Sequence, residues 1–127
     1  MKNIIIKNVY AVGMHHWGPR QLEIGSIYFL KLEEENPRDH NAVAVFEDRQ
    51  TRHCKAYLRR CDALVISKLF RDNLIHGCFY LKPKSGLDRF SQRTGPAQKC
   101  NIGFQTSDEN VAHVTQILQN VGSFIVD

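Results

Sequence analysis

Hydrophobic and polar positions along this chain change over short distances, which is the pattern of β-strands. The densest apolar run, from Ile4 to Val12, is rich in β-branched residues and predicts the first strand. Three shorter runs predict strands at Ser26 to Leu32, Ala42 to Phe46 and Arg52 to Leu58. The polar turn between the last two strands indicates a β-hairpin.

Two later segments carry apolar residues at the spacing of an α-helix. The first, from Cys61 to Asn73, has Asp62 in its first turn, where a negative charge suits the helix dipole. The second begins with Thr106 to Glu109, which has the form of a capping box. The buried stripe expected on this second helix comprises Val111, Val114, Leu118 and Val121.

The remaining pattern predicts strands at Ile75 to Leu81 and Lys99 to Phe104, and a short closing strand at Phe124 to Val126. Between the first two lies Lys82 to Gln98, a basic stretch that we expect to be a long loop. The order is four strands, a helix, two strands and a helix. It predicts one domain over residues 1–127, mainly β with two helices (α+β), folded as a small barrel or curled sheet with the helices packed on it.

The composition is that of a globular protein, with 43% hydrophobic and 24% charged residues. No run approaches the roughly 20 apolar residues of a membrane helix, and the first residues hold too few apolar side chains for a secretion signal. We therefore expect an intracellular protein without a membrane partner. In that setting the cysteines are expected to be free thiols, because no Cys-x-x-Cys motif joins Cys54, Cys61, Cys78 and Cys100.

The sequence holds no recognisable metal centre or catalytic motif. The adjacent pairs His53-Cys54 and His15-His16 lack the spacing of a zinc site, so neither a metal nor a cofactor is expected. There is no P-loop, nucleophile elbow or His-Glu-x-x-His motif. The carboxylates of Glu33 to Glu35 and Asp39 lie on one local stretch, whereas a metal-dependent nuclease gathers carboxylates from several strands. We predict a binding protein and not an enzyme.

Charge is distributed unevenly along the chain. Residues 52–99 contain eleven basic and three acidic residues, a net charge of +8, whereas the rest of the chain carries a net charge of −4. Such asymmetry is typical of a face that binds a polyanion. The same charges can also point in many directions over an ordinary solvated surface, and the sequence leaves both interpretations open.

One segment is more specific than these patterns. Residues Asn36 to Ala42, here called the Asn36 loop, read NPRDHNA and lead into an apolar strand. This segment resembles the hallmark Asn-Pro-x-Asp-x-Asn-Ala of the HIRAN domain. The stretches from Val12 to Trp17 and from Lys55 to Arg60, and the C-terminal helix, match further marks of that family in order and spacing. The resemblance covers nearly the whole chain and implies a small OB-like β-barrel with added helices.

The HIRAN resemblance also implies a function. It implies a module that captures the 3′ end of single-stranded DNA and directs helicase-like motors to stalled replication forks. We therefore expect a single-stranded DNA end with its 3′-hydroxyl as the partner, a role in DNA repair and a nuclear location. We also expect a monomer, acting alone or within a larger parent chain, with protein partners.

Five residues carry the expected site in and near the loop. Within the resemblance Asp39 matches the acceptor for the 3′-hydroxyl, although an aspartate here also forms a turn by accepting a backbone hydrogen bond two residues on. Asn36 is expected to shape the loop or touch a base edge, and Asn41 to be structural. Arg38 stands where DNA-binding members carry a stacking aromatic; its guanidinium can stack or pair with phosphate. Tyr57 matches a pocket-lining position, or else packs half-buried in its strand.

Aromatic side chains for base stacking are expected from two other parts of the chain. His15, His16 and Trp17 match a segment that carries basic and aromatic residues in the family. Trp17 either stacks on a base or packs in the core, while the two histidines are expected in the site as weaker phosphate partners than an arginine would be. The candidates for a second aromatic on the other side of the base are Phe79, Tyr80 and Phe90.

Two other binding hypotheses stay open. Arg38 and the His15-His16 pair favour a protein-interaction adapter that keeps the fold and has lost DNA binding. Binding of RNA ends is a third hypothesis, because the same pocket accepts either sugar. DNA-end binding predicts that basic side chains surround the Asn36 loop, and the adapter hypothesis does not. The basic residues concerned are Arg38, Lys82, Lys84 and Arg93.

Overall fold

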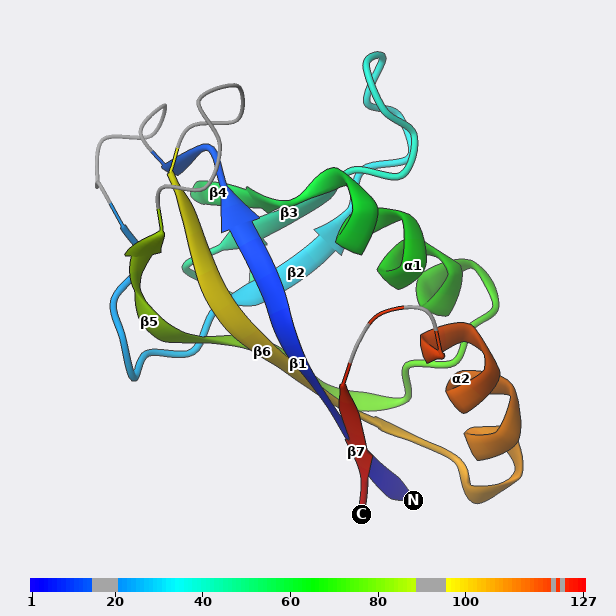
Figure 1. Ribbon diagram of the computed structural model, residues 1–127. Coiled ribbons are helices and arrows are strands. Elements are labelled where there is room, and N and C mark those ends of the chain that lie inside the picture. The colour runs from blue at the N-terminus through cyan, green and yellow to red at the C-terminus, as the bar shows by residue number, and fades with distance from the viewer. Residues whose placement is uncertain (15–20, 89–95, 120, 122) are drawn as a thin grey trace.

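The computed structural model describes residues 1–14, 21–88, 96–119, 121 and 123–127 (Figure 1). Strands dominate these residues, which confirms the prediction of a mainly β fold with two helices. None of the described helices is long and apolar enough to cross a membrane. The elements in chain order are β1 (Lys2–Val12), β2 (Phe29–Leu32), β3 (Val43–Phe46), β4 (Cys54–Leu58), α1 (Arg60–Arg71), β5 (Gly77–Asp88), β6 (Ala97–Thr106), a 3-10 helix (Asp108–Asn110), α2 (Val111–Leu118) and β7 (Phe124–Val126).

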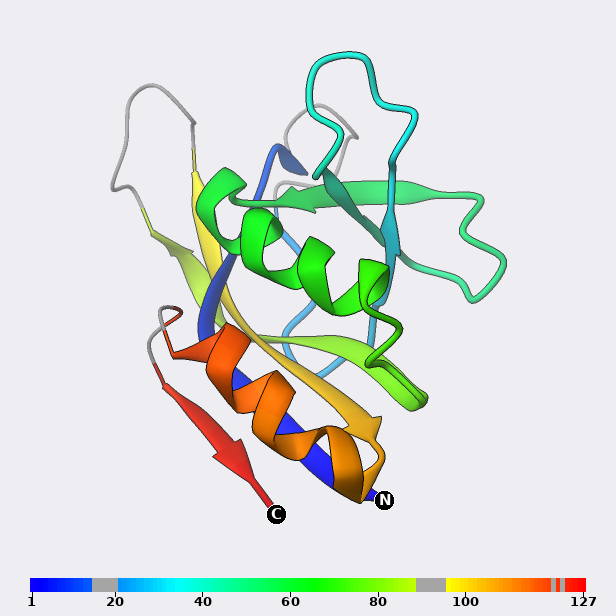
Figure 2. The same ribbon diagram turned by 90° about the vertical axis from the view of Figure 1, so that its right-hand side faces the viewer.

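The strands form one antiparallel sheet in the order β2-β3-β4-β1-β6-β5, with β7 paired to β1. The sheet curls until Tyr28, just before β2, bridges to Leu81 of β5. This contact brings the two ends of the sheet together, so the sheet forms a small half-closed barrel of the OB-like kind. Helices α1 and α2 lie next to each other and cover one side of it (Figure 2).

The long strand β1 changes its buried face at a bulge. Ile4 and Ile6 are buried at even positions, and Val9 and Ala11 are buried at odd positions. The register with β6 shifts between Ile6 and Val9, and Asn8 in this interval has a φ of 63°. An extra residue in a strand reverses which side chains face inward. One strand thereby stays in the core along its whole length, although its apolar pattern changes phase.

The predicted loop over residues 82–98 is wrong at both ends. Strand β5 continues to Asp88 and β6 begins at Ala97, with Pro83 of β5 opposite Cys100 and Leu87 opposite Gln98. Lys82 and Lys84 are exposed on either side of the buried Pro83, which is the alternation of a strand. Lys82 and Lys84, two of the basic residues that suggested a loop, therefore lie on the solvent face of β5.

Gln98 is a buried polar residue that joins three segments. Its Oε1 accepts a hydrogen bond from Leu22 N at 2.7 Å, and its Nε2 donates to Leu22 O at 2.9 Å and to Ser85 O at 3.0 Å. The side chain is fully buried. Since a buried amide is stable only when its donors and acceptor are paired, Gln98 holds the segment before β2 against β5 and β6.

The two helices pack through their apolar faces, as their spacing predicts. Helix α1 buries Ala63, Ile66 and Leu69, and α2 buries Val114 and Leu118.

The expected capping box at Thr106 to Glu109 does not form. Thr106 is the last residue of β6, and Ser107 caps a 3-10 helix without a side-chain hydrogen bond. The hydroxyls of Thr106 and Ser107 are buried without a hydrogen-bond partner among the described residues. The continuation of the strand through Thr106 takes that residue away from the helix end.

Candidate nucleic-acid interface

The Asn36 loop is shaped by its own polar side chains. Asn36 Oδ1 accepts a hydrogen bond from Arg38 N at 2.9 Å, and Asp39 Oδ1 accepts one from Asn41 N at 2.9 Å. These are two consecutive Asx turns, the first of which encloses Pro37, and asparagine and aspartate favour this local arrangement. The loop projects from the sheet between β2 and β3 (Figure 1). The turn-forming role that the sequence allowed for Asp39 is therefore present.

The loop is anchored to α1 by Asn41. Its Oδ1 accepts hydrogen bonds from Ser67 Oγ at 3.3 Å and from Arg71 Nη1. Arg71 Nη2 also donates to His40 O at 2.8 Å. Asn41 therefore has the structural role expected of it, and the loop is held against the helix across about thirty residues of sequence.

Asp39 uses its second carboxylate oxygen in an ion pair with Arg60, the first residue of α1. Asp39 Oδ2 lies 3.7 Å from Arg60 Nε, and the Arg60 side chain is 81% exposed. Both residues line an open hollow of about 560 Å³, here called the Asp39 hollow. Its described lining consists of Arg38, Asp39, Asn41, Arg60, Cys61 and Leu64.

Arg60 is a site residue that the sequence did not single out. It was one of eleven basic residues between positions 52 and 99, and nothing local distinguishes it from Arg59 beside it. Arg59 instead pairs with the buried Asp62 at 3.2 Å and lies over the Tyr10 ring. The one feature of the sequence that could have indicated a site role for Arg60 is its place three residues after Tyr57, which was itself predicted to line the pocket.

Asn36 and Tyr57 meet through Glu33. Tyr57 Oη donates to Glu33 Oε1 at 2.9 Å, and Asn36 Nδ2 donates to the same oxygen at 3.2 Å. Burial and the hydrogen bond to Glu33 raise the pKa of Tyr57 well above its usual value. Because both side chains are hydrogen-bonded to Glu33, they stabilise the start of the loop, where it leaves β2.

A second hollow lies beside the first half of the same loop. It has a volume of about 630 Å³ and is lined by residues 31–37, which include Glu33, Glu34 and Glu35 together with Lys31. This wall is acidic, whereas the Asp39 hollow contains Arg38 and Arg60 against a single aspartate. An anionic ligand is therefore favoured in the Asp39 hollow and disfavoured in its neighbour.

Some of the residues predicted for the site fall outside the part of the chain that the structure describes. They are His15, His16, Trp17, Phe90 and Arg93.

Other candidates from β5 belong to a different surface. Lys82 and Lys84 lie on β5 and line neither hollow of the loop. Phe79 packs edge-on against Phe70 and Phe104 and lines a separate depression together with Tyr80. These two aromatic side chains therefore do not border the Asp39 hollow.

Within the described segments, no three histidine, cysteine, aspartate or glutamate side chains lie close enough to hold a metal ion. Cys54, Cys61 and Cys100 are free thiols. Burial raises the pKa of the Cys100 thiol to about 12.

Comparison with known proteins identifies the fold. Neither a protein-family model nor a curated protein sequence matches the chain. The crystal structure of the HIRAN domain of human HLTF is similar, with a TM-score of 0.72 and 15% sequence identity over 96% of this chain and 93% of that chain. A protein from Lactobacillus plantarum is similar with a TM-score of 0.56 and 16% identity, over 83% of this chain and 100% of that one. The chain therefore has a HIRAN-like fold, as the sequence resemblance predicted.

Proposed function

We propose that this protein is a nucleic-acid-binding module that recognises the 3′ end of single-stranded DNA in the Asp39 hollow. The observation that carries the proposal is the pairing of Asp39 with Arg60 at an open surface. A strand end presents a hydroxyl donor next to an anionic phosphate, and it requires a carboxylate acceptor next to a cation. The HIRAN-like fold supports the same function.

Each residue of the site has a distinct role in this proposal. Asp39 accepts the hydrogen bond of the 3′-hydroxyl, and Arg60 turns from Asp39 to the neighbouring phosphate. Arg38, which is exposed at the rim, stacks on the terminal base or pairs with a second phosphate. Asn36 and Tyr57 hold the loop through Glu33 and do not read a base.

The segment from His15 to Trp17 completes the proposed site. Trp17 supplies a stacking surface for a base, and the two histidines contact phosphate. The module binds without chemical turnover and without a cofactor. It acts as a monomer in the nucleus, on DNA that is under repair. It does so alone or as part of a larger parent chain, together with protein partners.

Binding of oligonucleotides with defined ends tests the proposal. Fluorescence anisotropy is measured with one single-stranded DNA sequence ending in a 3′-hydroxyl or a 3′-phosphate, over a series of salt concentrations. We expect at least about a tenfold preference for the hydroxyl, because Asp39 repels a terminal phosphate, and weaker binding as salt increases. Equal binding of both ends, or none at low salt, would overturn the proposal. An RNA strand with the same end tests whether the 2′-hydroxyl is accepted.

Protein interaction is the second candidate function. It is favoured by the acidic hollow at Glu33 to Glu35 and by Lys82 and Lys84, which lie on β5 away from the loop. A polyanion-binding loop is expected to gather these lysines and avoid the glutamates. If the protein binds no oligonucleotide at low salt although circular dichroism shows that it is folded, this result would support the second function.

A further inference from the structure

The two ends of the curled sheet, β2 and β5, are joined at one point only within the described residues. Tyr28 N donates to Leu81 O at 2.9 Å, and Leu81 N donates to Tyr28 O at 2.9 Å. Beyond this bridge the two strands have no further described pairing. An open seam therefore remains between β2 and the beginning of β5.

On the side of β2 that faces this seam, the backbone has no partner among the described residues. In an antiparallel pair, successive residues point their backbone groups alternately to the two sides. The backbone groups of Tyr28 point toward β5, and the backbone N–H of Glu33 donates to Ala42 O on the β3 side. By this alternation the backbone groups of Leu30 and Leu32 point toward the seam. No described backbone group pairs with those of Leu30 or Leu32 there. An unpaired strand edge of this kind is a template for another strand.

Apolar side chains line a hollow at the seam. It has a volume of about 580 Å³, a size that suits a few side chains of a ligand. Ile27 beside β2 is 49% exposed there. The full described lining consists of Ile27, Phe29, Leu30, Arg49, Thr51, Phe79 and Tyr80. Its apolar residues come from both strands, so a ligand here is held from two sides.

Two cations flank this seam hollow. The Arg49 guanidinium carbon lies 5.4 Å from the centre of the Phe29 ring, and Lys82 Nζ lies 5.5 Å from the centre of the Tyr80 ring. None of the described lining residues is acidic. The hollow therefore combines an apolar floor with Arg49 in its lining and Lys82 beside the Tyr80 ring.

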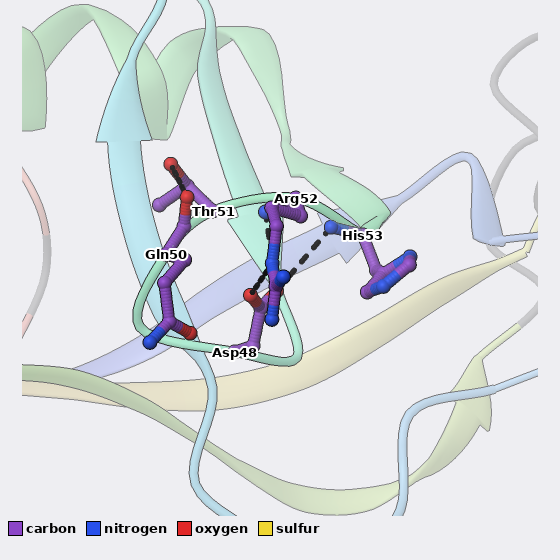
Figure 3. Close-up of polar contacts among 5 residues, drawn as sticks. All are labelled: Asp48, Gln50, Thr51, Arg52 and His53. Atoms are coloured by element: carbon purple, nitrogen blue, oxygen red, sulfur yellow. Dashed lines mark hydrogen bonds and ion pairs between the residues drawn. The ribbon is translucent and has the colours of Figure 1, made fainter.

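The turn that presents Arg49 is held by Asp48. The Asp48 carboxylate accepts hydrogen bonds from Arg52 N at 3.1 Å, Arg52 Nε at 3.2 Å and His53 N at 3.3 Å (Figure 3). Burial opposes ionisation of Asp48, but the hydrogen bonds from Arg52 and His53 outweigh it and lower the pKa of this carboxyl. Arg49 therefore emerges from a turn whose shape is fixed before a ligand arrives.

Tyr80 is also fixed on the other wall. Its ring packs over Gly103, its partner on β6, and a Cβ at that position would lie 2.4 Å from the ring. Only glycine permits this approach. Figure 2 shows the β3–β4 turn and the start of β5 projecting on the same side of the molecule. The Arg49 turn and the Tyr80 ring are thus each in contact with neighbouring residues, Asp48 holding the turn and Gly103 making room for the ring.

We propose that this seam binds an extended peptide segment of a partner protein, in which an apolar side chain is flanked by acidic residues. The peptide pairs with the free edge of β2 at Leu30 and Leu32. Its apolar side chain enters the seam hollow, and its carboxylates meet Arg49 and Lys82. The seam is separate from the Asp39 hollow, so this inference is independent of DNA-end binding and gives the second candidate function a defined surface.

A peptide fits these observations better than a nucleic acid. Phe29 and Tyr80 each carry a cation on the ring, whereas bases bind single-strand proteins by stacking on open aromatic faces. The free amides and carbonyls of the β2 edge match the spacing of a peptide backbone. A nucleic acid has no backbone of that kind to pair with them.

Short labelled peptides of defined pattern test the proposal. The first alternates valine and glutamate, the second replaces each glutamate by lysine, and the third is the first with N-methyl groups on the backbone amides of one edge. Anisotropy is expected to detect the first peptide only. Backbone amide shifts in two-dimensional NMR are expected at Leu30, Leu32 and Phe79. Failure of the acidic peptide to bind, or equal binding of the three peptides, would overturn the proposal.

Charge reversal on each wall locates the peptide. Arg49→Glu and Lys82→Glu are each expected to weaken binding about fivefold, as for a lost rim ion pair. Lys68→Glu, the same change on the exposed face of α1, is the matched control and is expected to leave the affinity unchanged. Binding that survives both wall variants would overturn the proposed position. So would a single-stranded oligonucleotide that shifts the seam amides where the peptide does not.

Discussion

The carboxylate of Asp39 holds two partners at once: its Oδ1 accepts the Asn41 amide at 2.9 Å, and its Oδ2 lies 3.7 Å from Arg60 Nε. One oxygen therefore shapes the loop while the other faces an exposed cation at the surface. This division makes the two roles of Asp39 separable by substitution.

Asp39→Asn and Asp39→Ala are expected to affect binding differently. Asn keeps a side-chain oxygen for the Asn41 amide and loses the charge, whereas Ala loses both. We expect both variants to lose the preference for a 3′-hydroxyl over a 3′-phosphate, measured by anisotropy. Only Asp39→Ala is expected to lose stability, by about 1 kcal/mol in urea unfolding, because one Asx hydrogen bond is removed. An unchanged preference in Asp39→Asn would contradict the proposed role of the charge.

Asn41→Ala is expected to destabilise the domain by about 1–2 kcal/mol, because its amide oxygen joins the loop to Ser67 and Arg71. Arg71→Ala is expected to cost about 1 kcal/mol, since its side chain is more exposed. The double variant should lose less than the sum, because the two residues share one interaction. Urea unfolding measures all three. Lys68→Ala on the same helix serves as the control.

Gln98→Ala is expected to lose about 3 kcal/mol of unfolding free energy. Three hydrogen bonds disappear, and the amide and carbonyl of Leu22 are left without their side-chain partner. Thermal and urea unfolding measure the effect. Gln116→Ala, at an exposed position of α2, removes the same side chain with little expected change. A loss at Gln98 as small as that at Gln116 would show that the segment before β2 is held by other contacts.

Stability is expected to fall above pH 10 through Tyr57. Burial and the hydrogen bond to Glu33 raise the pKa of Tyr57 in the folded protein, while an unfolded tyrosine ionises near pH 10. The stabilisation that the raised pKa of Tyr57 gives the folded protein is fully present below about pH 10. It is lost as the pH rises further, because Tyr57 releases its proton in the unfolded chain before it does so in the folded protein. Urea unfolding across alkaline pH should therefore show a shallower decline for Tyr57→Phe. Tyr80→Phe leaves the Tyr57–Glu33 hydrogen bond intact and should keep the original decline.

Cys61 and Cys100 are expected to differ greatly in reactivity. Cys61 is exposed in the Asp39 hollow, whereas Cys100 is buried and its pKa is raised to about 12. Alkylation with iodoacetamide at neutral pH, followed by peptide mass spectrometry, should modify Cys61 first. Cys100 should react only after denaturant opens the domain. Bound DNA should slow alkylation of Cys61 without changing Cys100, and comparable rates at both thiols in the folded protein would contradict the burial of β6.

Local patterns of sequence were sufficient for most elements. The apolar spacing at Ala63, Ile66 and Leu69 predicted α1, and the polar turn after Phe46 predicted the β3–β4 hairpin. The loop at Asn36 was recognisable because its turns depend on neighbouring side chains only. The long loop predicted over residues 82–98 failed because charged residues are compatible with a strand when its other face is covered. That cover comes from distant parts of the chain.

The mainly β fold, the two helices and the turn-forming loop follow from the sequence pattern, because alternation, helical spacing and Asx hydrogen bonds act over a few residues. The long-range contacts follow from the tertiary structure: Arg60 meets Asp39, Asn41 meets Arg71, and Tyr28, just before β2, bridges to Leu81 of β5. These contacts join residues 21, 30 and 53 positions apart. Such pairs depend on how the sheet curls and on the register of its strands, and neither is encoded in a local pattern.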